Sequence, residues 1–202
     1  MNKKIVHDAL ILTAFTLALG LILGMVYGIT KNARDAASEA ARKAAFQAVF
    51  ADAADFKAVE YDKNEANSMI KDAGFSDTID DVEQALAGDG SVLGYVITVT
   101  AKDGSQGSIT FSVGIQNDGT VNGYSITDIG ETPGLGMKAA EAAFYSQFEN
   151  KKVDSFAVVK QKPSADNEIE SITGSTITSK AMANGCNAAI HYFQNALGGA
   201  QS

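Results

Sequence analysis

Apolar residues fill the start of the chain without interruption. Residues 9–29 read ALILTAFTLALGLILGMVYGI and contain no charged side chain. As a helix, this stretch would be about 30 Å long, which is the hydrocarbon thickness of a bilayer. A cleaved signal peptide has a shorter apolar region followed by small residues, whereas Lys31 and Arg34 follow directly here. The pattern predicts an uncleaved transmembrane helix over 9–29, behind a short N-terminal tail of residues 1–8.

The next segment changes to a helical pattern with scattered charges. Residues 32–56 are rich in alanine, and Phe46, Val49 and Phe50 fall on one apolar face. This pattern predicts a helix that leaves the membrane, within a connecting helical segment of residues 30–60. Residues 62–87 are mixed and polar, which is typical of short helices and loops.

Alternation of apolar and polar residues then predicts strands. The segments 93–101, 107–116 and 121–128 are rich in β-branched and aromatic residues. Asp103-Gly104 lies between the first two, and the hairpin signal Asn117-Asp118-Gly119 lies between the last two. We therefore expect a three-stranded antiparallel meander.

The C-terminal part returns to helical spacing. Residues 136–149 predict a helix, 153–159 a short strand, 160–167 a polar connection, and 178–196 a final helix. One face of the final helix carries Met182, Cys186, Ala189 and Phe193. The order of elements indicates an α+β fold with an antiparallel sheet flanked by helices over residues 61–202.

Charge and composition exclude several function classes. The net charge is −8 without a basic cluster, so nucleic-acid binding is not expected. One cysteine and two distant histidines provide neither a disulfide nor a metal site nor a Ser-His-Asp triad. We assign no catalytic residue and no metal ligand, and we expect Cys186 to be a buried apolar residue.

Hydroxyl side chains crowd the stretch SITGSTITSKAM, residues 171–182, just before the final helix. Such residues cap helix N-termini by accepting bonds from free N–H groups. The same geometry, with a glycine that lets the backbone approach, also suits a phosphate. It is not a nucleotide P-loop, because the GxxxxGK[ST] spacing is missing. Capping and phosphate binding both remain open on this pattern alone.

Two short motifs carry a family resemblance. Thr173-Gly174-Ser175-Thr176-Ile177-Thr178 resembles the flavinylation motif [ST]-G-A-T-x-[ST] of FMN-binding domains, with Thr173 where serine is usual and Ser175 where alanine is usual. Residues 131–136 read ETPGLG and are similar to a second signature of these domains. The family comprises G subunits of Rnf electron-transport complexes and C subunits of sodium-pumping quinone reductases, and the length is similar to the G subunits.

The resemblance implies a covalent cofactor. FMN would be joined by a phosphodiester to the Thr178 hydroxyl, in a reaction performed by a separate flavin transferase with FAD as donor. The implied cofactor-binding residues are Thr173, Gly174, Ser175, Thr176 and Ile177 around the phosphate and ribityl chain, and Thr132, Gly134, Leu135 and Gly136 near the isoalloxazine ring. Glu131 has two open roles, a hydrogen-bonding residue of the loop or a solvated turn residue.

The resemblance also implies the role and the place of the domain. The chain would relay electrons in a membrane-bound ferredoxin:NAD oxidoreductase that translocates Na⁺ or H⁺, in contact with the other membrane and peripheral Rnf subunits and with membrane lipid. Counting Lys and Arg beside the span would put the domain inside, whereas family members carry it outside the cytoplasm, which is the orientation we expect. The alternatives are an anchored extracytoplasmic domain that binds a phosphorylated ligand non-covalently, and a hydrolase with a Ser or Thr nucleophile, which lacks a nearby histidine.

Overall fold

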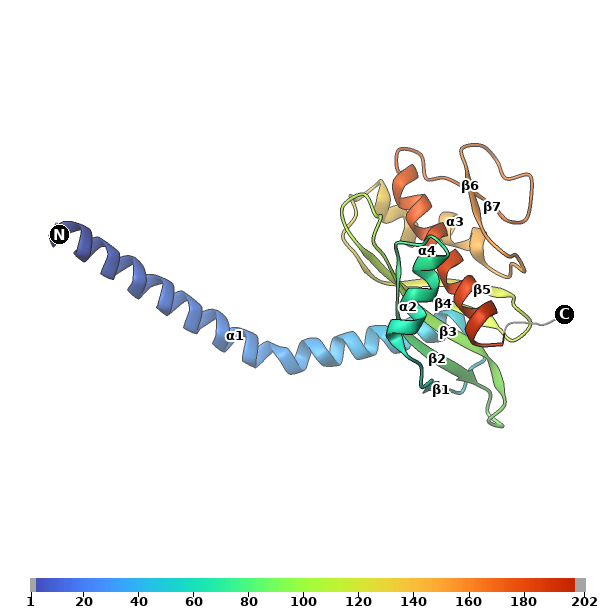
Figure 1. Cartoon of the computed structure of the whole chain (residues 1–202), viewed down its shortest axis with the longest axis horizontal. Coiled ribbons are helices and arrows are strands. Elements are labelled where there is room, and N and C mark those ends of the chain that lie inside the picture. Colours follow the sequence, from blue (N-terminus) through green and yellow to red (C-terminus); the bar gives the residue numbers. More distant parts are fainter. Residues whose placement is uncertain (1–2, 199–202) are drawn as a thin grey trace. The chain divides into compact units, whose positions relative to one another are not determined.

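The apolar segment forms part of one long helix in the computed structural model, which describes residues 3–198 (Figure 1). This helix, α1, runs over Lys3–Val49 and is the one helix within the described residues that is long and apolar enough to cross a membrane. Its side chains over residues 9–29 are exposed, as lipid contact requires. The chain forms two compact units, Met1–Arg42 and Lys43–Ser202, so the last turns of α1 belong to the second unit.

The expected connecting helix ends earlier than the sequence indicated. Helix α1 stops at Val49, and Phe56 lies in strand β1 (Asp55–Ala58) instead of a helix. The Gln47 amide donates hydrogen bonds to the carbonyls of Phe50, Ala51 and Ala53, at 3.2, 2.8 and 3.3 Å. These bonds satisfy carbonyls of the turn that follows the helix and hold the chain in a non-helical path. The expectation of helix through residues 50–60 is therefore wrong, while the buried face of Phe46, Val49 and Phe50 is confirmed.

A five-stranded antiparallel sheet forms the centre of the second unit, in the order β1-β2-β3-β4-β5. The expected meander is confirmed as β3 (Val92–Ala101), β4 (Ile109–Gln116) and β5 (Val121–Ile129). Strand β2 (Thr78–Leu86) was not expected, because residues 62–87 suggested helices and loops. Irregular pairing between Ile79 and Asp81 shifts its alternation, which hides the period of two in the sequence.

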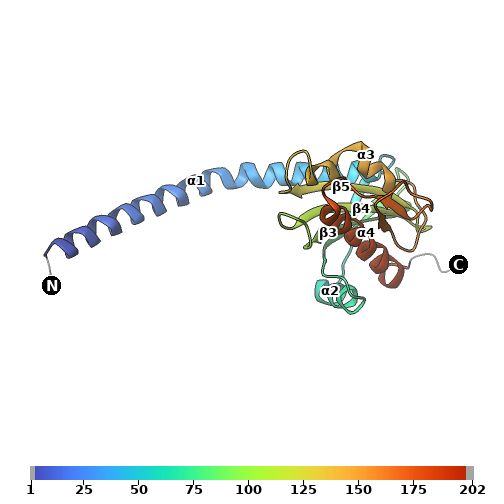
Figure 2. The ribbon, with the colours of Figure 1, turned by 90° about the horizontal axis from the view of Figure 1, so that it is seen from above.

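Both faces of the sheet are covered. Helices α2 (Lys63–Asp72) and α4 (Thr176–Ala196) pack on one face, as Figure 2 shows. Ile97 of β3 belongs to the core beneath α4, whereas the neighbouring Val96 packs with Phe46 and Phe50 from the end of α1. Successive strand residues point to opposite faces, so the last turns of α1 cover the face opposite α4. The antiparallel sheet flanked by helices confirms the expected α+β class.

Helix α4 approaches the sheet closely at one glycine. A Cβ on Gly185 would lie 2.5 Å from Phe111 Cζ, so any larger residue would push the helix away from β4. The expected face of Met182, Cys186, Ala189 and Phe193 is fully buried. Burial raises the pKa of the Cys186 thiol far above its usual range, which agrees with the expected inert apolar role.

Short helical turns replace the single helix expected over 136–149. They are η1 (Gly136–Ala140), α3 (Ala142–Tyr145) and η2 (Ser146–Phe148). Glu141 between them is extended, with φ −89° and ψ 144°, while Phe144 and Phe148 reach the core. The expected strand over 153–159 is shorter, β6 (Ala157–Val159), and it pairs in parallel with β7 (Glu168–Glu170), which the sequence did not indicate.

A buried carboxylate gives the fold a pH dependence. Asp77 is 4% exposed, and neither carboxylate oxygen has a hydrogen-bond partner among residues 3–198. Burial, and then the charge of Asp103, raise the pKa of Asp77 to about 6. The backbone amides of Lys102 and Asp77, which lie close but outside hydrogen-bonding geometry, and the charge of Lys102 lower it by a smaller amount. The free energy that this group contributes to stability is complete below about pH 4 and is lost as the pH rises through 6.

We therefore expect Asp77→Asn to raise the free energy of unfolding by about 1–3 kcal/mol at pH 7.5 and to change it little at pH 4. Urea denaturation of the full chain in detergent at both pH values measures this difference. Asp72→Asn, which removes an exposed carboxylate, serves as the control. An equal effect of Asp77→Asn at both pH values would contradict the assignment.

Candidate functional site

The hydroxyl motif forms the tight entry into α4. Gly174 is left-handed at φ 79°, and the Ser175 amide donates to the Ile172 carbonyl at 2.9 Å. The first amide of the helix to find a backbone acceptor is that of Ser179, which donates to the Ser175 carbonyl at 3.1 Å. Within the described residues, the N–H groups of Thr176, Ile177 and Thr178 have no acceptor. Ile177 is exposed and Thr176 is half-buried, so their N–H groups are available to an anion, whereas Thr178 is 0% exposed.

The hydroxyls of the motif bond to one another instead of capping the helix. Ser175 occupies the N-cap position, but its side chain makes no capping bond. Its Oγ shares a hydrogen bond with Thr178 Oγ1 at 2.8 Å. Ser179, which the sequence reasoning overlooked, donates from Oγ to the Ser175 carbonyl at 3.0 Å and accepts from the Ile172 amide at 2.9 Å. Side-chain capping therefore does not explain the cluster.

The second motif forms a turn that reaches the first one. The Thr132 carbonyl accepts from the amides of Leu135 and Met137 at 3.1 and 3.2 Å, and Gly134 is left-handed at φ 76°. A Cβ built on Gly174 would lie 3.2 Å from Leu135 Cδ2, so the two motifs meet at this point. Contact between residues so distant in sequence is what a binding site made of both motifs requires.

The side chain of Glu131 connects this turn to a neighbouring loop. Its side chain is 4% exposed, and its Oε1 accepts from the amides of Ser105 and Gln106 at 2.6 and 3.2 Å. The same side chain fills the space beside Gly136, where an added Cβ would have no room. Burial excludes the solvated role considered for Glu131. Its bonds join the turn to the loop between β3 and β4.

Three large apolar side chains are exposed in or directly beside the two motifs. Outside α1, the large hydrophobic side chains exposed among the described residues are Leu135, Met137 and Ile177, at 43, 39 and 58%. Leu135 and Ile177 belong to the motifs, and Met137 follows directly after ETPGLG. Met137 was missed because an isolated methionine in a helical pattern suggests core. Together the three side chains form what we call the apolar rim.

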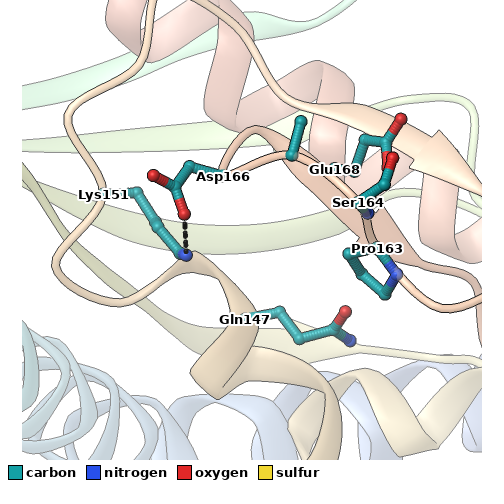
Figure 3. Close-up of a pocket in the computed structure, with 7 residues that line it drawn as sticks. Gln147, Lys151, Pro163, Ser164, Asp166 and Glu168 are labelled. Atoms are coloured by element: carbon teal, nitrogen blue, oxygen red, sulfur yellow. Dashed lines mark hydrogen bonds and ion pairs between the residues drawn. The ribbon is translucent and has the colours of Figure 1, made fainter.

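Two hollows lie near these elements. One, of about 240 Å³, is bordered by Thr173 from the hydroxyl motif and by Lys138, Phe144 and Ile172. The other, of about 470 Å³, is shown in Figure 3, where Lys151 and Asp166 point toward one another with Nζ and Oδ1 3.5 Å apart. None of the residues expected from the sequence lines this larger hollow. The candidate site is therefore the junction of the motifs beside the smaller one.

Comparison with known proteins assigns the family. A family model described as "FMN-binding domain" matches residues 104–191, which include both motifs. The G subunit of the Na(+)-translocating ferredoxin:NAD(+) oxidoreductase complex of Acetobacterium woodii is 35% identical over 150 residues, covering 73% of this chain and 71% of that protein. The chain belongs to the family of Rnf complex G subunits.

A second sequence relative agrees with this membership in the Rnf G family. The G subunit of the proton-translocating ferredoxin:NAD(+) oxidoreductase complex of Clostridium ljungdahlii is 40% identical over 107 residues, which cover 53% of this chain and 57% of the relative. Among solved structures, the C subunit of the Na(+)-translocating NADH-quinone reductase from Parabacteroides distasonis matches at 22% identity and a TM-score of 0.48, over 71% of this chain and 79% of that one. Membership in the Rnf G family rests on the sequence relatives.

The buried bonds of Glu131 predict a large effect of its removal in this Rnf G family member. Glu131→Ala removes the carboxylate that accepts from the amides of Ser105 and Gln106, and we expect a loss of about 1–3 kcal/mol in the free energy of unfolding. Glu131→Gln keeps a carbonyl acceptor and should lose less than half as much. Urea denaturation measures both values. Equal stability of the alanine variant and the wild type would contradict the structural role.

Proposed function

We propose that this chain carries FMN bound covalently to Thr178 and relays electrons as a subunit of a membrane-bound ferredoxin:NAD oxidoreductase. One observation carries the proposal. At the junction of the two motifs, three free backbone N–H groups adjoin an exposed apolar rim. A ligand that fits must combine an anionic group with an apolar, extended part, and FMN does so.

The residues present fit the two ends of FMN. The free amides of Thr176 and Ile177 and the exposed backbone at Gly174 suit the phosphate, since a helix N-terminus favours negative charge. The apolar rim suits the isoalloxazine ring. Bound FMN would supply the redox chemistry that protein side chains lack. The chain's own part is to hold the cofactor, orient it and cover one side of it.

The remaining motif residues act as supports in this proposal. Thr132 and Gly134 shape the turn that presents Leu135, and Gly136 lets Glu131 pack beneath it. Tyr124 donates a hydrogen bond of 2.7 Å to the Ala139 carbonyl and so fixes η1 to the sheet. Thr173 and Ser175 border the phosphate end. None of these residues needs to act as acid or base, which agrees with an electron carrier that has no catalytic residues of its own.

The proposed setting is the cell membrane. Helix α1 anchors the chain in lipid, and the domain lies on the extracytoplasmic side, where a covalent bond prevents loss of the cofactor. Other Rnf subunits would supply and accept the electrons, and a flavin transferase would attach the FMN. Relatives named for Na⁺ and for proton translocation both match this chain, so the proposal includes translocation of either ion by the complex.

One observation favours a second candidate, an anchored extracytoplasmic domain that binds a phosphorylated ligand non-covalently. Thr178 is 0% exposed, whereas non-covalent binding would need only the free amides and the apolar rim. The two candidates differ in whether the ligand survives denaturation.

The covalent bond is tested by substitution of neighbouring threonines. Full-length protein expressed with its flavin transferase should give a fluorescent band on a denaturing gel under ultraviolet light. We expect Thr178→Ala to abolish this band and the matched control Thr176→Ala to retain it. A band that persists in Thr178→Ala would contradict the site, and a dark wild-type band would favour non-covalent binding.

The apolar rim is tested separately from the bond. The double variant Leu135→Gln and Ile177→Gln keeps the Thr178 hydroxyl, so the flavin should still be attached. Loss of the rim should free the ring, which we expect to lower its fluorescence anisotropy and raise its accessibility to iodide quenching. Lys162→Gln on an exposed loop is the control. Unchanged anisotropy in the double variant would show that the isoalloxazine ring does not bind at the apolar rim.

A further inference from the structure

The proposed acceptor hydroxyl is enclosed by its own neighbours. We propose that the side chains of Ser175 and Ser179 form a hydroxyl latch that keeps Thr178 buried, and that the flavin transferase modifies Thr178 when the turn of residues 172–179 opens. This inference rests on the proposed function and adds to it two residues that control the attachment reaction.

The contacts of the latch are specific. Ser175 Oγ, 2.8 Å from Thr178 Oγ1, is the partner of the acceptor hydroxyl. Ser179 Oγ closes the turn by bonding both to the Ser175 carbonyl and to the Ile172 amide. Thr178 and Ser179 are 0% exposed, and Ser175 is 7% exposed. A phosphorus atom of FAD cannot reach Thr178 Oγ1 while these contacts persist.

In the closed turn, Thr173 and Thr176 are more accessible to a transferase than Thr178, the proposed acceptor. Thr173 is exposed and Thr176 is half-buried, whereas the proposed acceptor is the most enclosed of these threonines. Selection of Thr178 therefore requires a conformation other than the closed one. In our proposal the transferase binds the opened segment, which presents Thr178 and separates it from Ser175.

Opening breaks the hydrogen bonds of Ser175 and Ser179 and exposes Ile172, which is 7% exposed in the closed turn. It breaks no bond of the three free amides in the first turn of α4, and Ile177 is already 58% exposed. In the opened form, Thr178 Oγ attacks the FMN phosphorus of FAD, its proton passes to a base of the transferase, and the bond to the departing AMP breaks. The new phosphodiester then pairs with the amides that were free.

Ser175→Ala removes only the Oγ atom of a buried side chain and adds no atom, so the fold has room for the change. It leaves the Thr178 hydroxyl buried without a partner, which destabilises the closed turn and not the open one. Loss of one net hydrogen bond raises the open population about two- to tenfold. Because the apparent dissociation constant of the transferase falls as the competent population rises, the change should appear in KM.

The test compares attachment rates on the full chain in detergent, with FAD and purified flavin transferase, by intact mass. We expect Ser175→Ala to raise kcat/KM about two- to tenfold through a lower KM, Ser179→Ala to act in the same direction, and Ser175→Thr to restore the wild-type rate. Ser112→Ala is the matched control, because it removes an equivalent buried hydroxyl pair, Thr98 Oγ1 and Ser112 Oγ at 3.1 Å, from the sheet. It should leave the rate unchanged.

The outcomes separate the latch from the proposed function. Wild-type protein that gains no FMN at Thr178 would overturn both. Wild-type protein that is modified at Thr178, with Ser175→Ala equal or slower, would overturn the latch alone. A fall in kcat for Ser175→Ala would instead indicate that the Ser175 hydroxyl takes part in proton transfer, and this too would overturn the latch. Acceleration of Ser112→Ala to the same extent would show a general effect of lost stability and would also contradict the latch.

Discussion

The close packing of α4 against β4 is the contact on which the candidate site depends. Gly185 allows the helix to lie directly on Phe111, and the buried face of α4 fixes its rotation about its own axis. The direction of α4 then determines where its first turn ends, beside the turn of residues 131–136. Gly185, two helical turns after Thr178 in the same helix, therefore influences how close the two motifs lie.

The first turn of α4 has hydrogen-bonded side chains but unpaired backbone amides. Its hydroxyls bond among themselves, and its amides remain free. A first helical turn of this kind is stabilised by an added anion. The apolar rim offers contacts to an apolar part of such a ligand, and the hydrogen bonds of the buried Glu131 fix the turn that carries Leu135. In our proposal, the free amides, the apolar rim and the latch belong to one site that binds FMN.

Sequence patterns predicted the parts of this protein that depend on local chemistry. The uncharged span, the hairpin of Asn117-Asp118-Gly119 and the two motifs are each complete within a few residues. Strand β2 was missed because irregular pairing breaks its alternation, and β7 because its three residues lack any distinct pattern. Thr178 is buried and bonded to Ser175 only in the folded turn, which periodicity does not describe. The contact of Leu135 with Gly174 likewise exists only in the folded sheet and helix.

We propose that a single threonine oxygen at the start of α4 bears a flavin phosphate in the native protein. Peptide mapping by mass spectrometry of the chain purified from native membranes tests it most directly. The account predicts that the peptide containing Thr178 gains the mass of FMN less one water, with the fragment ions placing it on Thr178. Native peptide at its unmodified mass, or FMN found on Thr173 or Thr176, would contradict it.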